Sequence, residues 1–168
     1  MAATIRPLQT ADAADYRECR LNALRLAPTA FSSSFESTSR LPDSFFEARA
    51  TFEAHSFIYG AFASNLLIGT AGGFVDPEIK RQHIGYVVGM WVDPEFRGQQ
   101  LARRLLEAVV AQFRTTGTIS EVQLGVTKGN ASALHLYESF GFSPWGEEPS
   151  ALLVDGVSYD QIHMAMRI

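Results

Sequence analysis

Residues 87–104 read VVGMWVDPEFRGQQLARR, and this stretch decides the fold class. Residues 84–92 are rich in β-branched and aromatic side chains and predict a strand that ends at Asp93-Pro94. A helix follows, because apolar side chains recur on one helical face over residues 101–113. A strand that enters a helix through a tight turn gathers unpaired backbone N–H groups at the positive end of the helix dipole. Such an arrangement attracts phosphate.

The first half of the chain predicts a strand, two helices and a β-hairpin. Thr10, with Asp12 in the first turn, is typical of a helix start. The serine-rich residues 31–37 are too polar to continue that helix, and Ser64-Asn65 separates two apolar runs as a hairpin turn does. The elements expected here are a strand at residues 4–8, a helix at 11–26, a helix at about 43–52 and two strands within 56–75.

The second half predicts alternating helices and strands that end in a second hairpin. Asn130 and Gly141 are typical N-cap and C-cap residues, and Asp155-Gly156 is typical of a two-residue hairpin turn. The predicted order is β-α-α-β-β-β-α-β-α-β-β, an α/β fold with a mixed sheet, helices on its faces and two parallel crossovers. The elements expected here are a helix ending at Gly117, a strand at 119–126, a helix at 130–140 and strands at about 142–154 and 157–166.

Composition narrows the class of protein. The chain has 168 residues, so we expect residues 1–168 to form one domain. The net charge is −4 with lysines and arginines dispersed, which argues against nucleic-acid binding. No apolar run approaches the ~18 residues of a membrane span, and we expect a soluble cytoplasmic protein. Cys19 is the single cysteine and the four histidines lack ligand spacing, so no metal site is expected.

The turn before the second-half helix has the residue types of a ligand cradle. Gly98 lets the backbone approach a ligand closely, and Ala102 keeps the next exposed position small. The glycine patterns of P-loops and of dinucleotide-binding folds are both missing from the segment. The sequence therefore predicts a phosphate-bearing ligand of another kind, with an ordinary capped amphipathic helix as the alternative.

This same segment resembles the acyl-CoA signature R/Q-x-x-G-x-G/A of the GNAT superfamily of N-acetyltransferases. Arg97 fills the first position and Ala102 the last, while Gln100 stands where the pattern has its middle glycine. With helical φ, Gln100 is still expected to donate its N–H there. The resemblance implies a GNAT-like fold and acetyl-CoA as cofactor, held by Met90, Trp91, Val92, Arg97, Gly98, Gln99, Gln100, Leu101, Ala102, Asn130 and Ala133.

Residues 126–142 resemble a second motif of that family, N-x-x-A-x-x-L-Y-x-x-x-G-F. The resemblance implies that Asn130 hydrogen-bonds the cofactor and that Tyr137 lies near its sulfur. Tyr137 would then be the catalytic residue, a general acid toward the departing thiolate. Alternatively, Asn130 caps a helix and Tyr137 packs in the core, and both interpretations can hold together.

The reaction implied by the resemblance is direct attack of an amine on the thioester. Family members often carry a glutamate on the strand before the signature, but residues 83–92 contain no carboxylate. Glu36, His83 or a water relay remain as candidates for the base. Cys19 has no neighbouring signature of a nucleophile, which disfavours a covalent acetyl-enzyme.

Two other functions and several acceptors stay open at this point. The chain is either an acetyltransferase or a non-catalytic acyl-CoA-binding or sensor module of the same fold, and a regulatory interaction domain is the third reading. The acceptor is a small-molecule or peptide amine. Neither nucleic acid nor membrane is expected as a partner, and a homodimer is compatible with the fold.

Overall fold

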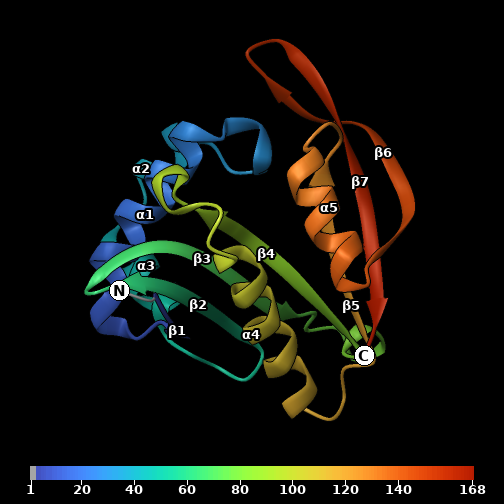
Figure 1. The fold of residues 1–168 in the computed structure, drawn as a ribbon, viewed down its shortest axis with the longest axis horizontal. Helices are drawn as coiled ribbons and strands as arrows, with labels where there is room; N and C mark the ends of the chain where they lie inside the picture. Colours follow the sequence, from blue (N-terminus) through green and yellow to red (C-terminus); the bar gives the residue numbers. More distant parts are fainter. Residues whose placement is uncertain (1–2) are drawn as a thin grey trace.

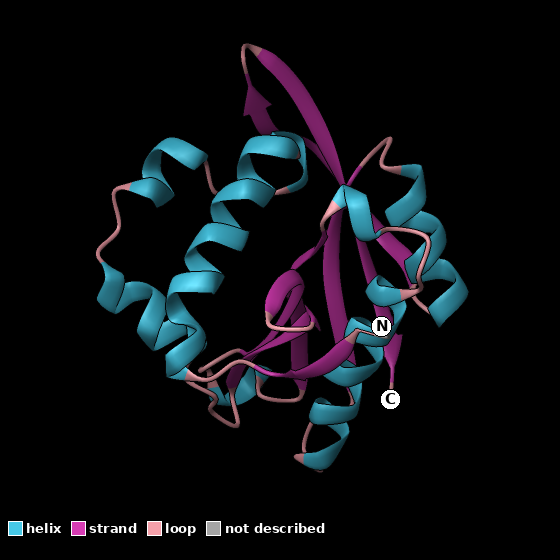
Figure 2. Cartoon of the chain, turned by 60° about the vertical axis from the view of Figure 1, so that its left-hand side comes forward, coloured by secondary structure: helices cyan, strands magenta, loops and turns pink. Residues whose placement is uncertain are grey.

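The computed structural model describes residues 3–168, which build a seven-stranded mixed sheet with helices on both faces (Figures 1 and 2). The strand order across the sheet is β1-β2-β3-β4-β5-β7-β6. The strands are β1 (Thr4–Pro7), β2 (Ser56–Ala63), β3 (Leu66–Val75), β4 (Ile84–Val92), β5 (Glu121–Thr127), β6 (Ser143–Val154) and β7 (Val157–Arg167). The helices are α1 (Ala13–Leu26), α2 (Phe35–Ser39), α3 (Asp43–Ala50), α4 (Leu101–Thr115) and α5 (Ala131–Phe140).

The predicted α/β class is confirmed, and the element order differs by one helix. Residues 31–37 were expected to lie outside any helix, but Phe35 begins the short helix α2. The Ser34 hydroxyl accepts a hydrogen bond from the Ser37 N–H and caps this helix. A serine within the polar stretch that follows α1 therefore starts a helix of its own.

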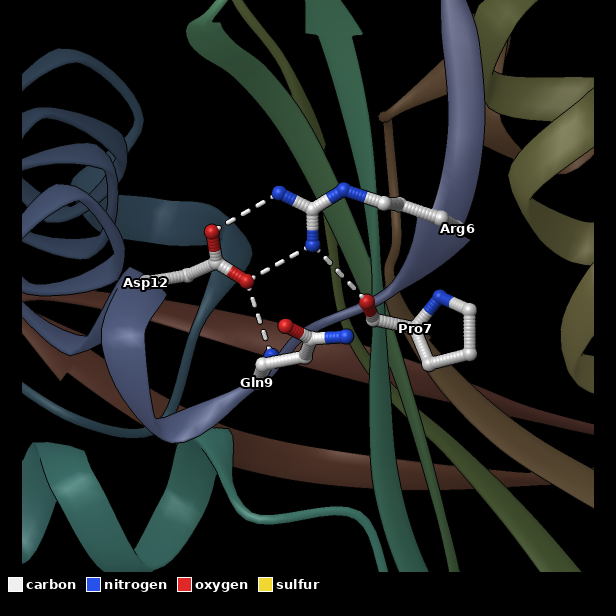
Figure 3. A network of polar contacts seen from close by, with 4 residues as sticks. All are labelled: Arg6, Pro7, Gln9 and Asp12. Atoms are coloured by element: carbon white, nitrogen blue, oxygen red, sulfur yellow. Dashed lines mark hydrogen bonds and ion pairs between the residues drawn. The ribbon is translucent and has the colours of Figure 1, made fainter.

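The start of α1 also differs from the expectation. Residues 10–12 form a 3-10 turn before α1, and Asp12 rather than Thr10 occupies the N-cap position of α1, without a capping bond from its side chain to that helix. The Asp12 carboxylate accepts the Gln9 N–H at 2.8 Å and two bonds from the Arg6 guanidinium, at 2.7 and 2.8 Å (Figure 3). Arg6 and Asp12 thereby fix the chain where β1 leads into α1.

One crossover, not two, leaves parallel strands. The sole parallel pairing described in residues 3–168 joins β4 to β5, and it covers only 84–86 against 121–123. The expected second crossover, through α5, leads to β6 at the sheet edge, and β7 takes the place beside β5 in antiparallel pairing. Beyond Tyr86 and Gln123 the two halves of the sheet diverge, which Figure 1 shows as the opening between β4 and the β6–β7 hairpin.

Two apolar clusters fill the two faces of the sheet. On one face α4 packs its buried side chains on β2, β3 and β4, and Phe113 at its end is fully buried. Phe113 fits there because Gly85 leaves room: a Cβ at Gly85 would lie 2.8 Å from the ring. On the other face α1 and α3 pack on β2 and β3.

Three of the predicted turns and caps are confirmed by the backbone. Asp155 and Gly156 both have positive φ, at 49° and 77°, in the turn between β6 and β7. Ser64 forms the turn between β2 and β3, and Gly141 ends α5 with φ of 116°. Among the helices of residues 3–168, none has the length and apolar character needed to span a membrane.

Candidate active site

A cleft of about 640 Å³ lies where the end of β4, the start of α4 and α5 converge. We call it the α4 cleft. Of the predicted cofactor-binding residues, Gln99 is the one outside its lining. The predicted residues that line it are Met90, Trp91, Val92, Arg97, Gly98, Gln100, Leu101, Ala102, Asn130, Ala133 and Tyr137.

Free backbone donors lie at the start of α4. The first helical hydrogen bond runs from the Arg104 N–H to the Gln100 carbonyl, at 3.0 Å. The N–H groups from Gly98 to Arg103 have no acceptor among the described residues. They lie at the positive end of a 15-residue helix, so the turn can bind an anionic group through its backbone.

Gln100 is the N-cap of α4, and the prediction that it has an ordinary helical φ is wrong. Its φ is 58° and its ψ is 17°, the left-handed region that favours glycine. The neighbouring Gly98 also has positive φ, at 78°. The chain therefore turns tightly enough at Gln100 to require a glycine-like conformation, and the glutamine side chain, which is exposed, makes no capping bond.

The charge of the α4 cleft suits an anion. Arg97 and Arg103 line it, and no aspartate or glutamate does among the described residues. The Arg97 Nε donates to the Val92 carbonyl at 3.1 Å, which orients its guanidinium across the end of β4. Arg103 lies over the ring of Phe140, at 5.5 Å, and so joins α4 to α5 at the edge of the cleft.

A bulge in β4 aims its backbone at the same cleft. Between the pairs Thr70↔Trp91 and Gly72↔Val88, two residues of β4 face one of β3. Gly89 takes positive φ there, at 61°, and its carbonyl accepts from the Thr70 hydroxyl at 3.1 Å. Met90 follows the glycine and lines the cleft. The extra residue has no ladder partner, which frees backbone groups of β4 to contact a ligand.

Asn130 and Tyr137 each combine the two interpretations that their motif left open. The Asn130 side chain caps α5 by accepting the Ala133 N–H at 3.3 Å, and it also lines the cleft. Tyr137 packs edge-on against Phe142 and is only 6% exposed, yet it too lines the cleft. Burial raises the pKa of the Tyr137 hydroxyl to about 12. A phenol at this pKa keeps its proton throughout the neutral range.

A second cleft, of about 590 Å³, lies on the α1 side of the diverging strands. We call it the α1 cleft. Three residues, Ala30, Phe31 and Gly125, line both clefts, so the two adjoin where β5 parts from β4. The Thr127 hydroxyl donates to the Thr29 carbonyl at 2.6 Å and holds the shared segment against β5.

The α1 cleft contains two arginines and a histidine that the sequence analysis did not single out. Arg20 comes from α1, Arg49 from α3 and His163 from β7. They are far apart in the chain and carry no local motif, so only the fold brings them together. Glu36 and His83, the two side chains considered as bases, line neither cleft.

Known proteins are similar to this chain in sequence and in fold. The mycothiol acetyltransferase of Thermobispora bispora is 48% identical over 60 residues, which are 36% of this chain and 19% of that protein. An acetyltransferase of the GNAT family from Streptococcus pneumoniae superposes with a TM-score of 0.85 at 22% identity, over 99% of each chain. The YncA protein of Salmonella typhimurium, solved with its cofactor acetyl-CoA, gives 0.81 at 20% identity over 99% of this chain and 94% of that one.

The family follows from the sequence match that covers most of the chain. The chain spans less than half the length of the curated relatives that it matches. The sequence model of the acetyltransferase (GNAT) family matches residues 21–142, which include β4, both clefts' shared segment, α4 and α5. This chain therefore belongs to the acetyltransferase (GNAT) family.

Proposed function

We propose that the chain transfers the acetyl group of acetyl-CoA to an amine by direct attack of the amine on the thioester. The observation that carries the proposal is the pair of adjoining clefts on the two sides of the opening between β4 and β5. One cleft can hold the acetyl donor and the other the acceptor. Their shared residue Gly125 marks where donor and acceptor would meet.

The residues of the α4 cleft fit acetyl-CoA. The free N–H groups from Gly98 to Arg103 suit its diphosphate, and Arg97 and Arg103 add positive charge. No carboxylate of residues 3–168 lines the cleft, and Arg103 has an ion-pair partner in Glu107 on the same helix, at 3.3 Å. The bulge in β4, through Met90, would offer backbone groups to the pantetheine arm and to the thioester carbonyl. When bound, acetyl-CoA supplies an activated acetyl group as a thioester.

Tyr137 would stabilise the thiolate that forms as coenzyme A leaves. Its hydroxyl makes no hydrogen bond among residues 3–168 and its ring lines the α4 cleft, so the O–H is available to a ligand. Its pKa of about 12 exceeds the roughly 8.5 of an ordinary thiol, so donating a hydrogen bond to the developing thiolate is favoured over complete proton transfer. Either way the negative charge on sulfur is stabilised.

His163 offers the amine a route for its proton. It pairs across strands with Gly125, the residue that both clefts share, and it lines the α1 cleft. Its Nε2 lies 2.9 Å from a Glu148 carboxylate oxygen. That carboxylate favours the tautomer with the proton on Nε2, which leaves Nδ1 as an acceptor for a proton, directly or through water.

The test uses Tyr137→Phe, with Tyr59→Phe as matched control. The Tyr59 hydroxyl contacts Gln112 at 3.4 Å and lines neither cleft. Acetyl-CoA binding is measured by calorimetry, and free-thiol release is measured with a panel of amines. We expect all three proteins to bind acetyl-CoA within about threefold, and Tyr137→Phe alone to lose about 10²-fold or more in kcat.

The same experiment decides the alternative, a non-catalytic acyl-CoA-binding or sensor module. One observation favours that alternative: among the described residues, no carboxylate lines either cleft. Binding of acetyl-CoA without turnover on any amine would support the sensor. Failure to bind acetyl-CoA would refute the assignment of the α4 cleft and the proposed function together.

The proposal also takes residues 1–168 as one catalytic domain that works in the cytoplasm. In support, one sheet runs from β1 to β7 and the single cysteine is buried, with a thiol pKa raised by burial to about 12. A thiol of this kind is inert to oxidation. A single cooperative unfolding transition in calorimetry is expected, and two separate transitions would contradict the one-domain assignment.

A further inference from the structure

The α1 cleft has a charge opposite to that of the chain. The chain carries a net charge of −4, yet the charged side chains that line this cleft are Arg20 and Arg49, with His163 beside them. No aspartate or glutamate lines it among the described residues, and only His163 has a carboxylate partner there, Glu148. The cleft thus has two arginines without counter-ions.

Arg20 is held in place but left without an anion. Its guanidinium lies over the ring of Phe31, at 4.5 Å, and one of its N–H groups reaches the Ser33 hydroxyl at 3.4 Å. No other hydrogen bond from this side chain exists among residues 3–168, so most of its five donors are free. Burial lowers the pKa of Arg20, and no carboxylate contributes to that pKa.

Several other arginines of the chain differ from Arg20 either in having a carboxylate partner or in being exposed to solvent. Arg25, on the same helix, also has no carboxylate partner, but it is exposed to solvent and lies over the ring of Phe35. Four other arginines each have a carboxylate within 4 Å, and none of them lines the α1 cleft. These pairs are Arg6–Asp12, Arg17–Glu18, Arg81–Asp76 and Arg103–Glu107.

Arg49 adds a second positive charge to the α1 cleft, near that of Arg20. It reaches the cleft from α3, is half-buried, and has no ion-pair partner in the described chain. Its charge is close enough to Arg20 to help lower the Arg20 pKa. Two like charges that converge in a partly desolvated cleft cost free energy, and a bound anion relieves that cost.

We infer that the acceptor is a small amine that also carries a carboxylate, that is, an amino acid, whose carboxylate is bound by Arg20 and Arg49. This inference rests on the proposed function. A guanidinium matches a carboxylate with two parallel hydrogen bonds, and a second arginine satisfies the remaining lone pairs. With its carboxylate at α1 and α3, the acceptor would extend its amine toward Gly125 and the thioester.

The walls of the cleft indicate an apolar body between the two charged ends. Phe74 and Tyr86 stack on the sheet side, with ring centroids 5.0 Å apart, and Phe45 and Leu41 line the helix side. At about 590 Å³ the cleft has the size of a small-molecule site. We therefore expect an amino acid with an aliphatic or aromatic side chain.

The experiment compares matched acceptors. The twenty L-amino acids are assayed with acetyl-CoA, and the best acceptor is then compared with its carboxamide and with the amine that lacks the carboxyl group. A charged hydrogen-bonded pair contributes about 1.5–3 kcal/mol, so we expect kcat/KM to favour the amino acid by about 10- to 150-fold. Binding of the same panel is also measured by calorimetry in the presence of coenzyme A.

Substitutions assign the effect to the arginines. Arg20→Gln and Arg49→Gln are each expected to raise the KM for the amino acid at least tenfold, with the KM for acetyl-CoA unchanged and a much smaller effect on the KM for the decarboxylated amine. Arg20→Lys keeps the positive charge but cannot form two parallel hydrogen bonds to a carboxylate, so its KM for the amino acid should lie between those of the wild type and Arg20→Gln. Arg25→Gln, on the same helix and outside both clefts, is the control and should change neither parameter.

Failure of the inference is distinguishable from failure of the proposed function. Equal or better turnover of the carboxamide or the decarboxylated amine would overturn the inference and leave the acetyltransferase intact. The inference would also be overturned if the protein acetylated other amines while no amino acid bound to it in calorimetry. Loss of acetyl-CoA binding in the wild-type protein would instead overturn the proposed function. Thermal unfolding of both glutamine variants confirms that they fold, and each arginine is tested separately.

Discussion

Replacing Gln100 by glycine is expected to stabilise the protein, because glycine is tolerated at a helix N-cap and adopts positive φ without strain. Gln100 has φ of 58°, and a side chain in this region costs about 1–2 kcal/mol relative to glycine. Its side chain is exposed and makes no capping bond, so no contact is lost. Against this, glycine adds about 0.4–1 kcal/mol of conformational freedom to the unfolded chain. The net gain is about 0.5–1 kcal/mol.

The neighbouring glutamine provides a matched control. Gln99 is exposed as well but does not have positive φ, so Gln99→Gly adds unfolded-state entropy without relieving strain. We expect Gln100→Gly to raise Tm by about 1–4 °C and Gln99→Gly to lower it by a similar amount, measured by calorimetry. Because Gln100→Gly preserves the turn, its Kd for acetyl-CoA should stay within about threefold of wild type. If both variants lost stability equally, the backbone argument at Gln100 would be refuted.

Two further predictions concern stability. Asp12→Asn should cost about 1 kcal/mol at pH 7, because the hydrogen bond from Arg6 holds the pKa of Asp12 below its ordinary 3.8. This contribution is fully present above about pH 4 and is lost as the pH falls through the lowered pKa, so wild type and variant should converge in acid denaturant titrations. Gly85→Ala should cost about 1–3 kcal/mol, because its Cβ would lie 2.8 Å from the buried ring of Phe113. Gly146→Ala, which has open space around its Cβ, should be near neutral in the same thermal unfolding assay.

The sequence predicted best those elements whose ends have strong local chemistry. Asn130 caps α5, Gly141 ends it, and Asp155-Gly156 turns the final hairpin, all as expected. Each of these residues acts within four positions along the chain, so the pattern is visible without the fold. The apolar face of α4 is another local signal, and the helix ends at Thr115, two residues before the expected Gly117.

Two features that the sequence did not predict, helix α2 and the α1 cleft, have different physical reasons. Helix α2 has only five residues, too short for a periodic signal, and its serine cap looks like a loop residue in the sequence. The α1 cleft depends on contacts between distant segments: Arg20, Arg49 and His163 lie on α1, α3 and β7. Such a cluster has no spacing to detect, because only tertiary packing creates it.

The arginines of the α1 cleft also bear on how an acceptor amine loses its proton. An amine attacks the thioester only in its neutral form, and residues 3–168 place no carboxylate in either cleft to take the proton. With a bound carboxylate, Arg20 and Arg49 still leave a net positive charge near the amine. A nearby like charge lowers the pKa of an ammonium group, so the side chains that bind the acceptor also favour its reactive form. The pH profile of kcat for an amino acid, which reports the enzyme–substrate complex, should therefore shift to higher pH in Arg49→Gln, whereas an unshifted profile would mean that His163 or water acts without this electrostatic help.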